Sequence, residues 1–162
     1  MKASVVAMLA AAAIGLLPPD GMAQSLSGGG LVVPGERMGP AELQPADQGA
    51  LVRALGAPDR DEQEGTHEYY RYRVETGGEL VVDFDLAEDA PLEISTTSHA
   101  YRTREGLGVG STEGEVRAKL GRPPCEGQAG DEVFLAYDGI RFLVSGGTVT
   151  KISIRPHGLL HC

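Results

Sequence analysis

The clearest alternation of apolar and polar residues lies near the end of the chain, at residues 133–144. Asp138-Gly139 interrupts it, and this dipeptide is typical of a two-residue β-hairpin turn. The pairs that such a turn predicts are Tyr137 with Ile140, Leu135 with Phe142, and Val133 with Val144. All six residues are apolar or aromatic, so the turn and the buried face predict the same register. A further strand at 148–154, with Ile152 and Ile154 on the same face, would follow.

A similar pair of alternating runs occurs earlier, at residues 69–74 and 80–85. The register that brings apolar residues together pairs Val74 with Leu80, Tyr72 with Val82, and Tyr70 with Phe84. The opposite face would then carry polar, charged and tyrosine side chains, with Arg71 directly across from Asp83. Such a face is either a solvated surface with weak cross-strand ion pairs or a surface that binds another protein.

A short helix is predicted before each of these strand groups. Pro45 is typical of a helix start, and the first helix would end at Leu55-Gly56-Ala57-Pro58. Thr112 and Glu115 form a capping-box pattern for the second helix, which would end at Leu120-Gly121-Arg122-Pro123. The two stop signals lie about 65 residues apart, and Tyr72 and Tyr137 share this offset. The pattern predicts an α+β fold of two tandem repeats, 43–98 and 99–162, each a short helix followed by a three-stranded antiparallel sheet.

The first residues have the three parts of a secretory leader. Lys2 supplies the positive charge, residues 5–17 are apolar, and small residues at Gly21 and Ala23 suit cleavage before Gln24. The apolar run is shorter than the roughly 20 residues of a spanning helix. We therefore expect a signal peptide at 1–23, a flexible Gly- and Pro-rich arm at 24–42, and a single domain at 43–162. We therefore expect the protein to be periplasmic or secreted, with no stable membrane insertion after the leader is cleaved.

Charge and cysteine content narrow the range of possible partners and sites. The net charge of −9, without a Lys/Arg cluster, disfavours nucleic acid as a partner. The two cysteines, Cys125 and Cys162, are expected to form a disulfide in an oxidising compartment, although free thiols or metal ligands are the competing interpretation.

The second helix region carries a family resemblance. Gly110-Ser111-Thr112, Glu115-Val116, Leu120-Gly121 and Cys125 together resemble the helix and the cysteine after it in beta-lactamase inhibitor protein-like folds. The region is also similar to the helix-plus-sheet domain of outer-membrane assembly lipoproteins. The resemblance implies an exported protein of tandem helix-plus-sheet repeats that binds proteins and does not catalyse a reaction. The first half lacks both the Gly-x-Thr pattern and the cysteine.

Signs of catalytic chemistry are sparse. The chain has no Gly-x-Ser-x-Gly motif, and its four histidines form no His-Glu-x-x-His pattern. The glycine-rich run 106–111 lacks the Gly-Lys-Ser/Thr ending of a phosphate-binding loop. We therefore predict no catalytic residue and no cofactor.

The resulting prediction is an exported, non-catalytic binding or scaffold protein that acts on another periplasmic or secreted protein, with an inhibitor-like role included. Its expected contact residues are Tyr69, Arg71, Arg73 and Asp83. One alternative is a periplasmic metal-binding protein, because His157, His161 and Cys162 offer imidazole and thiolate ligands. A second alternative is a small hydrolase with an unfamiliar site.

Overall fold

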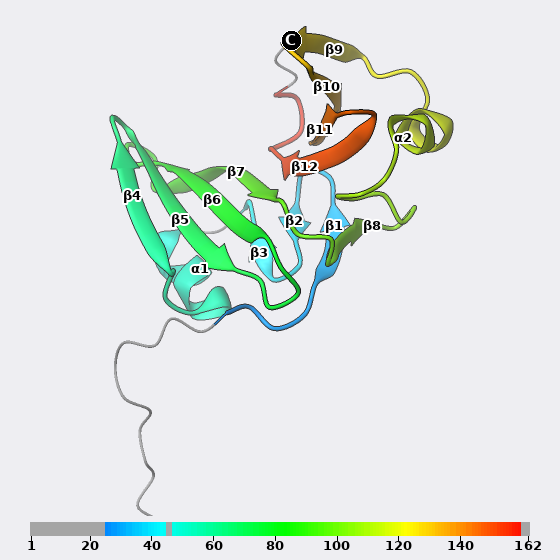
Figure 1. Ribbon diagram of the computed structural model, residues 1–162. Helices are drawn as coiled ribbons and strands as arrows, with labels where there is room; N and C mark the ends of the chain where they lie inside the picture. The colour runs from blue at the N-terminus through cyan, green and yellow to red at the C-terminus, as the bar shows by residue number, and fades with distance from the viewer. Residues whose placement is uncertain (1–24, 45–46, 160–162) are drawn as a thin grey trace, which may run out of the picture.

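Two β-sheets and two short helices make up the fold, which a computed structural model describes for residues 25–44 and 47–159 (Figure 1). The large sheet has eight strands, and each neighbouring pair is antiparallel. In spatial order its strands are β4 (Arg60–Glu64), β5 (His67–Arg73), β6 (Glu79–Asp85), β7 (Ala90–Thr96), β12 (Thr148–Ile154), β11 (Ile140–Ser145), β10 (Glu132–Tyr137) and β9 (Cys125–Ala129).

The small sheet has four strands and is mixed. Its order is β3 (Ala41–Glu42), β2 (Arg37–Met38), β1 (Gly30–Val33) and β8 (Tyr101–Thr103). β1 and β8 are parallel, whereas the other pairs are antiparallel. Apolar residues of both sheets and both helices form one buried cluster, and its largest members include Tyr72, Phe84, Phe142 and Met38.

Both predicted helices are present and short. α1 (Gln48–Leu55) begins after Asp47, whose side chain accepts a hydrogen bond from the backbone N–H of Ala50. The residue at which we expected it to begin, Pro45, lies outside the described residues. α2 (Glu113–Leu120) has the predicted capping box between Thr112 and Glu115. Each helix ends at a glycine with positive φ, 87° at Gly56 and 79° at Gly121.

The predicted fold class, two helix-plus-three-strand repeats at 43–98 and 99–162, was wrong. Four strands of the large sheet lie between the two helices and four follow the second helix, and all eight form one sheet that is continuous through the β7–β12 pairing. The prediction missed β4 and β9 because neither has an alternating apolar face. As edge strands they need no second partner, so their residues are free to be polar.

The segment predicted to be a flexible arm, 24–42, is part of the folded structure from residue 25 onward. It supplies β1, β2 and β3, and Val32, Met38 and Ala41 are buried. At Gly30 the glycine reflects close packing, because a Cβ there would lie only 2.4 Å from the Cα of Gly39.

The register of the β10–β11 hairpin is confirmed, with Tyr137 opposite Ile140 and the two predicted pairs beyond it. In the β5–β6 hairpin the predicted register is wrong by two residues. Tyr72 lies opposite Leu80, and Arg71 lies opposite Val81 instead of Asp83. Gly77 and Gly78 both have positive φ, so the chain turns back within a tighter loop than the one we expected. A shift of two residues preserves the side-chain alternation, and the predicted inner and outer faces are therefore retained.

Candidate functional site

A shallow hollow of about 290 Å³ lies on the outer face of the large sheet, the face that points away from the buried cluster. It spans strands β5, β6, β7 and β12. Three of the four predicted contact residues, Tyr69, Arg71 and Asp83, line it. The rest of the lining is Glu79, Val81, Glu93, Ser95, Thr96, Thr97, Lys151 and Arg155. Arg73, the fourth predicted residue, lines a neighbouring hollow instead.

A row of small side chains crosses the centre of the sheet, and two of its members, Val81 and Ser95, line the floor of the hollow. Val81 lies opposite Ser95, and Ser95 lies opposite Ser153. Longer side chains continue this row at both ends, because Arg71 is opposite Val81 and Arg141 is opposite Ser153. Ser95 is only 4% exposed and Ser153 only 5%, although they belong to the outer face. The small residues therefore form a depression below a rim of long charged side chains.

Opposite charges are paired around this rim. Glu93 accepts a 2.6 Å hydrogen bond from Arg155, and its carboxylate lies 3.9 Å from the ammonium of Lys151. Arg71 donates to Glu62 at 2.9 Å and to Glu79 at 3.3 Å. The hydrogen bond to Glu62 is the largest cause of the raised pKa of Arg71. The rim thus presents both signs of charge in fixed positions.

Arg73 is held outside the hollow by Asp59. Its Nε and Nη2 donate to Asp59 Oδ1 at 3.0 and 2.9 Å, and its backbone N–H donates to the other carboxylate oxygen. These hydrogen bonds hold the residue before β4 against the end of β5. Asp59 lies 14 residues before Arg73, so the sequence did not reveal this structural partner.

His67 lies beside the hollow, in contact with Asp83 of its lining, and the sequence analysis missed it. Its Nδ1 lies 2.8 Å from Oδ1 of Asp83, and its ring stacks on Tyr69 with centroids 6.1 Å apart. The hydrogen bond to Asp83 raises the pKa of His67 above its ordinary value of 6.5. The signal was present in the alternation, since His67 is two residues from Tyr69 and shares its face.

The alternative metal site is only partly described. His161 and Cys162 lie outside the described residues, and Nδ1 of His157 lies 3.0 Å from a carboxylate oxygen of Asp138. Within residues 25–44 and 47–159, no group of three or more His, Cys, Asp or Glu could hold a metal ion. Cys125 is buried at the start of β9, and its predicted disulfide partner, Cys162, is again outside the described residues.

None of the helices in the part of the chain that the structure describes has the length and apolar character needed to cross a membrane.

Comparisons with known proteins show likeness of fold alone. No family model matches the chain, and no curated protein matches it in sequence. A DUF4309 family protein from Bacillus subtilis has a TM-score of 0.55 at 17% identity, with 75% of this chain and 88% of that one covered. A cysteine-rich secretory protein from Staphylococcus aureus has a TM-score of 0.53 at 13% identity, with 82% and 50% covered.

A third solved structure, an extracellular protein containing a SCP domain from Bacillus anthracis, has a TM-score of 0.52 at 9% identity. The match covers 68% of this chain and 43% of that one, so the chain spans half or less of the two longer proteins. The resemblance to beta-lactamase inhibitor proteins and assembly lipoproteins stays a prediction, because these three structures carry other descriptions.

Proposed function

We propose that the mature protein is an exported, non-catalytic binding protein that recognises another periplasmic or secreted protein through the outer face of its large sheet. The observation that carries the proposal is the hollow itself, with a small-residue floor and a rim that includes Tyr69 and Arg71. Tyrosine and arginine are among the residues that most often dominate the energy of protein interfaces.

The dimensions of the hollow favour a side chain of a partner over a free small molecule. Its volume of about 290 Å³ is at the lower end of the range for small-molecule pockets, and its lining is more polar than such pockets usually are. A protruding side chain of a partner would reach the hydroxyl-bearing floor, while the rim makes polar contacts around it.

The chemistry of the lining supports binding over catalysis. Its carboxylates each have a cationic or imidazole partner, as in Glu93 with Arg155 and Asp83 with His67. Such pairing engages each carboxylate with a neighbouring side chain, whereas a general acid or base must be placed to reach a substrate. Export is supported by the predicted leader at residues 1–23.

The test is a capture experiment with matched variants. The mature wild type, a Tyr69→Ala/Arg71→Ala variant and a control variant would each be immobilised and exposed to periplasmic extract and culture fluid of the source cells. Leu31→Ala/Arg104→Ala is a suitable control, because both residues are exposed and neither lines the hollow. Quantitative mass spectrometry would identify the retained proteins.

We expect at least one exported protein to be retained by the wild type and the control, and its purified form to bind the face variant about tenfold or more weakly. A tenfold loss corresponds to about 1.4 kcal/mol, and the roughly 2 kcal/mol of an interface hot spot would give a loss of about thirtyfold. Equal retention by a correctly folded Tyr69→Ala/Arg71→Ala variant would remove the basis of the proposal.

A further inference from the structure

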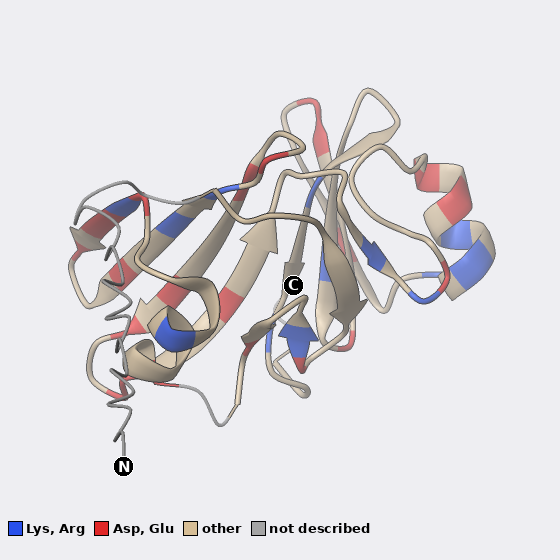
Figure 2. Cartoon of the chain, turned by 90° about the horizontal axis from the view of Figure 1, so that it is seen from below, with Lys and Arg blue, Asp and Glu red and all other residues tan. Residues whose placement is uncertain are grey.

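The negative charge of this protein is concentrated in one half. Residues 47–98 contain thirteen Asp or Glu and four Lys or Arg, a balance of −9, whereas 99–162 contain eight Lys or Arg and seven Asp or Glu. In Figure 2, α2 carries residues of both signs, and acidic residues are frequent on the strands at the opposite end of the molecule. The first half of the large sheet is therefore strongly acidic.

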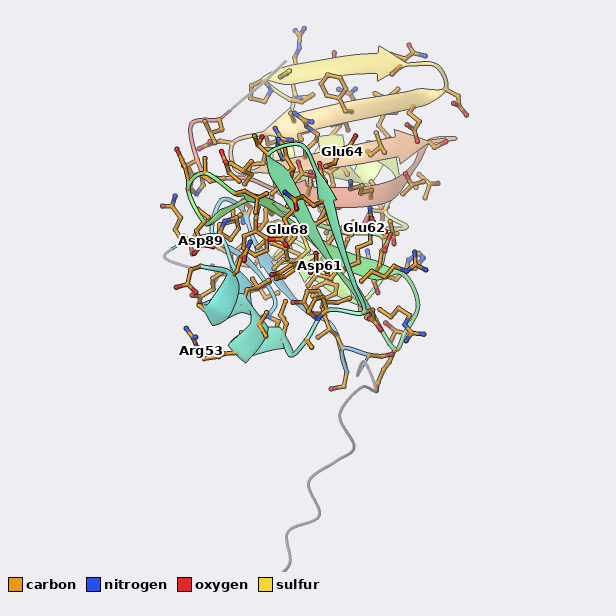
Figure 3. The ribbon with its side chains drawn as sticks, turned by 90° about the vertical axis from the view of Figure 1, so that its left-hand side faces the viewer. Arg53, Asp61, Glu62, Glu64, Glu68 and Asp89 are labelled. Carbon is orange, nitrogen blue, oxygen red and sulfur yellow. The ribbon has the colours of Figure 1, made fainter. Side chains whose placement is uncertain are left out.

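This acidic half ends in an open sheet edge. β4 is the outermost strand, it pairs only with β5, and each of its five residues is exposed. An edge strand has backbone N–H and C=O groups on its outer side that can pair with a further strand. Figure 3, which faces this edge, shows Asp61, Glu62 and Glu64 along β4.

Acidic side chains lie on both faces of the edge. Glu62 is opposite Tyr69 and shares the outer face, whereas Asp61 is opposite Tyr70 and shares the face on which α1 packs. On that second face Glu68 accepts a hydrogen bond from the side chain of Gln48 at the start of α1. The backbone N–H of Gln48 lies 3.5 Å from a carboxylate oxygen of Asp89.

The electrostatics of this cluster are those of crowded carboxylates. Burial and then the neighbouring Asp61 are the largest causes of the raised pKa of Glu68, and Asp89 adds to the effect. The nearby cations are Arg60 at the start of β4, Arg71, which pairs with Glu62, and Arg53 on α1 (Figure 3). A strand added here would consequently meet negative potential on both of its faces.

The negative charge of this edge also determines which kind of strand can pair with β4. Each β4 strand carries three carboxylates and one cation, Arg60, so pairing two of them from separate molecules would bring an excess of negative charge together, which is unfavourable. A strand with lysine or arginine would instead find opposite charges beside it. We propose that the outer edge of β4 binds an extended Lys- or Arg-rich segment of another protein, which adds a strand to the large sheet.

The other edge of the sheet provides a contrast. β9 has only one charged residue, Glu126, and that side chain accepts a 2.8 Å hydrogen bond from Arg117. The acidic pair Asp131 and Glu132 lies at the β9–β10 turn and is exposed. Neutralising this pair changes the net charge by the same amount as neutralising two residues of β4.

The inference goes beyond the proposed function, because it concerns the edge of the sheet and not the hollow on its outer face. Its test uses a short synthetic peptide in which Lys and Thr alternate. Two control peptides accompany it, one with Glu in place of Lys, the other with the same charges but N-methyl groups on alternate backbone amides. Binding to the mature wild type would be measured by calorimetric titration, and protection of the β4 amides by hydrogen exchange.

We expect saturable binding of the lysine peptide with protection of residues 60–64, and at least tenfold weaker binding of both control peptides. The Asp61→Asn/Glu64→Gln variant should bind the lysine peptide about three- to tenfold more weakly, the scale of two partly exposed ion pairs. The Asp131→Asn/Glu132→Gln variant should bind like the wild type.

Three outcomes would overturn the inference. Equal binding of the N-methylated peptide would mean that charge alone attracts the peptide. An equal loss in both double variants would mean that the net charge of the whole molecule decides the affinity. Protection of residues 60–64 that grows with protein concentration and without peptide would mean that a second copy occupies the edge.

Discussion

At the scale of single residues, the His67–Asp83 pair beside the hollow is sensitive to pH. Because the pKa of His67 is raised in the folded state, protonated His67 stabilises the fold relative to the unfolded chain. This contribution is fully present below about pH 6.5 and is lost as the pH rises through the raised pKa. The charge beside Asp83 therefore changes as the pH rises through the raised pKa of His67.

An NMR titration of the ring protons of His67 would test this pair. We expect a midpoint above 6.5 in the wild type, because the hydrogen bond to Asp83 favours the imidazolium form. The Asp83→Asn variant should lower the midpoint, and Asp85→Asn should lower it less, because Asp85 acts only through its charge. A midpoint that does not respond to Asp83→Asn would contradict the assignment.

At the scale of secondary-structure elements, the segment before α1 has the largest structural role that we did not predict. Val32, Met38, Ala41 and Leu43 are buried, and the other residues between Val32 and Leu43 are exposed or partly exposed. β1, β2 and β3 are too short to show alternation, and they pair with each other and with β8. The small sheet therefore belongs to the folded structure.

Two substitutions in this segment distinguish a folded sheet from a flexible arm. Met38→Ala should lower the free energy of unfolding by about 2–5 kcal/mol, because Met38 is completely buried. Leu31→Ala, at a position 45% exposed, should change it by less than about 0.5 kcal/mol. Denaturant unfolding of the purified mature protein measures both, and a Met38→Ala variant as stable as the wild type would contradict the role of the small sheet.

The elements that sequence analysis predicted correctly are those with a local cause. The capping box of α2 and the Asp138-Gly139 turn each lie within a few residues, so their chemistry is readable in one stretch of sequence.

Pairing between β7 and β12 has no such signal, because it joins strands from different halves of the chain. Part of the hollow was missed for this reason, since Glu93, Lys151 and Arg155 meet only through that pairing. Tyr69, Arg71 and Asp83 were found because alternation places them on one face.

At the scale of the whole molecule, the predicted disulfide would link the second half of the large sheet to the end of the chain. Cys125 begins β9, the edge strand farthest from β4, and Cys162 is the last residue. A bridge between them would close a loop of most of the second half and contribute roughly 3–4 kcal/mol in the chain-entropy model.

Mass spectrometry of the purified, non-reduced protein tests this bridge. We expect a monomer whose mass rises by two hydrogens after reduction, and a lower thermal midpoint of unfolding in the reduced form. A Cys125→Ser/Cys162→Ser variant should unfold at the same temperature with and without reductant. Alkylation of both cysteines without prior reduction would show that the bridge is absent.

The parallel pairing of β1 with β8 has a consequence for biogenesis. Gly30 lies beside Tyr101, so the N-terminal strand cannot complete its sheet until the chain has been made as far as residues 101–103. A protein that crosses a membrane N-terminus first would therefore hold Val32 and Met38 exposed during much of its passage. Non-local pairing of this kind slows folding and prolongs the exposure of apolar, aggregation-prone segments. Under the proposed export, the export machinery and its chaperones would accordingly meet this protein as an unfolded chain, and the native structure would form only after passage across the membrane.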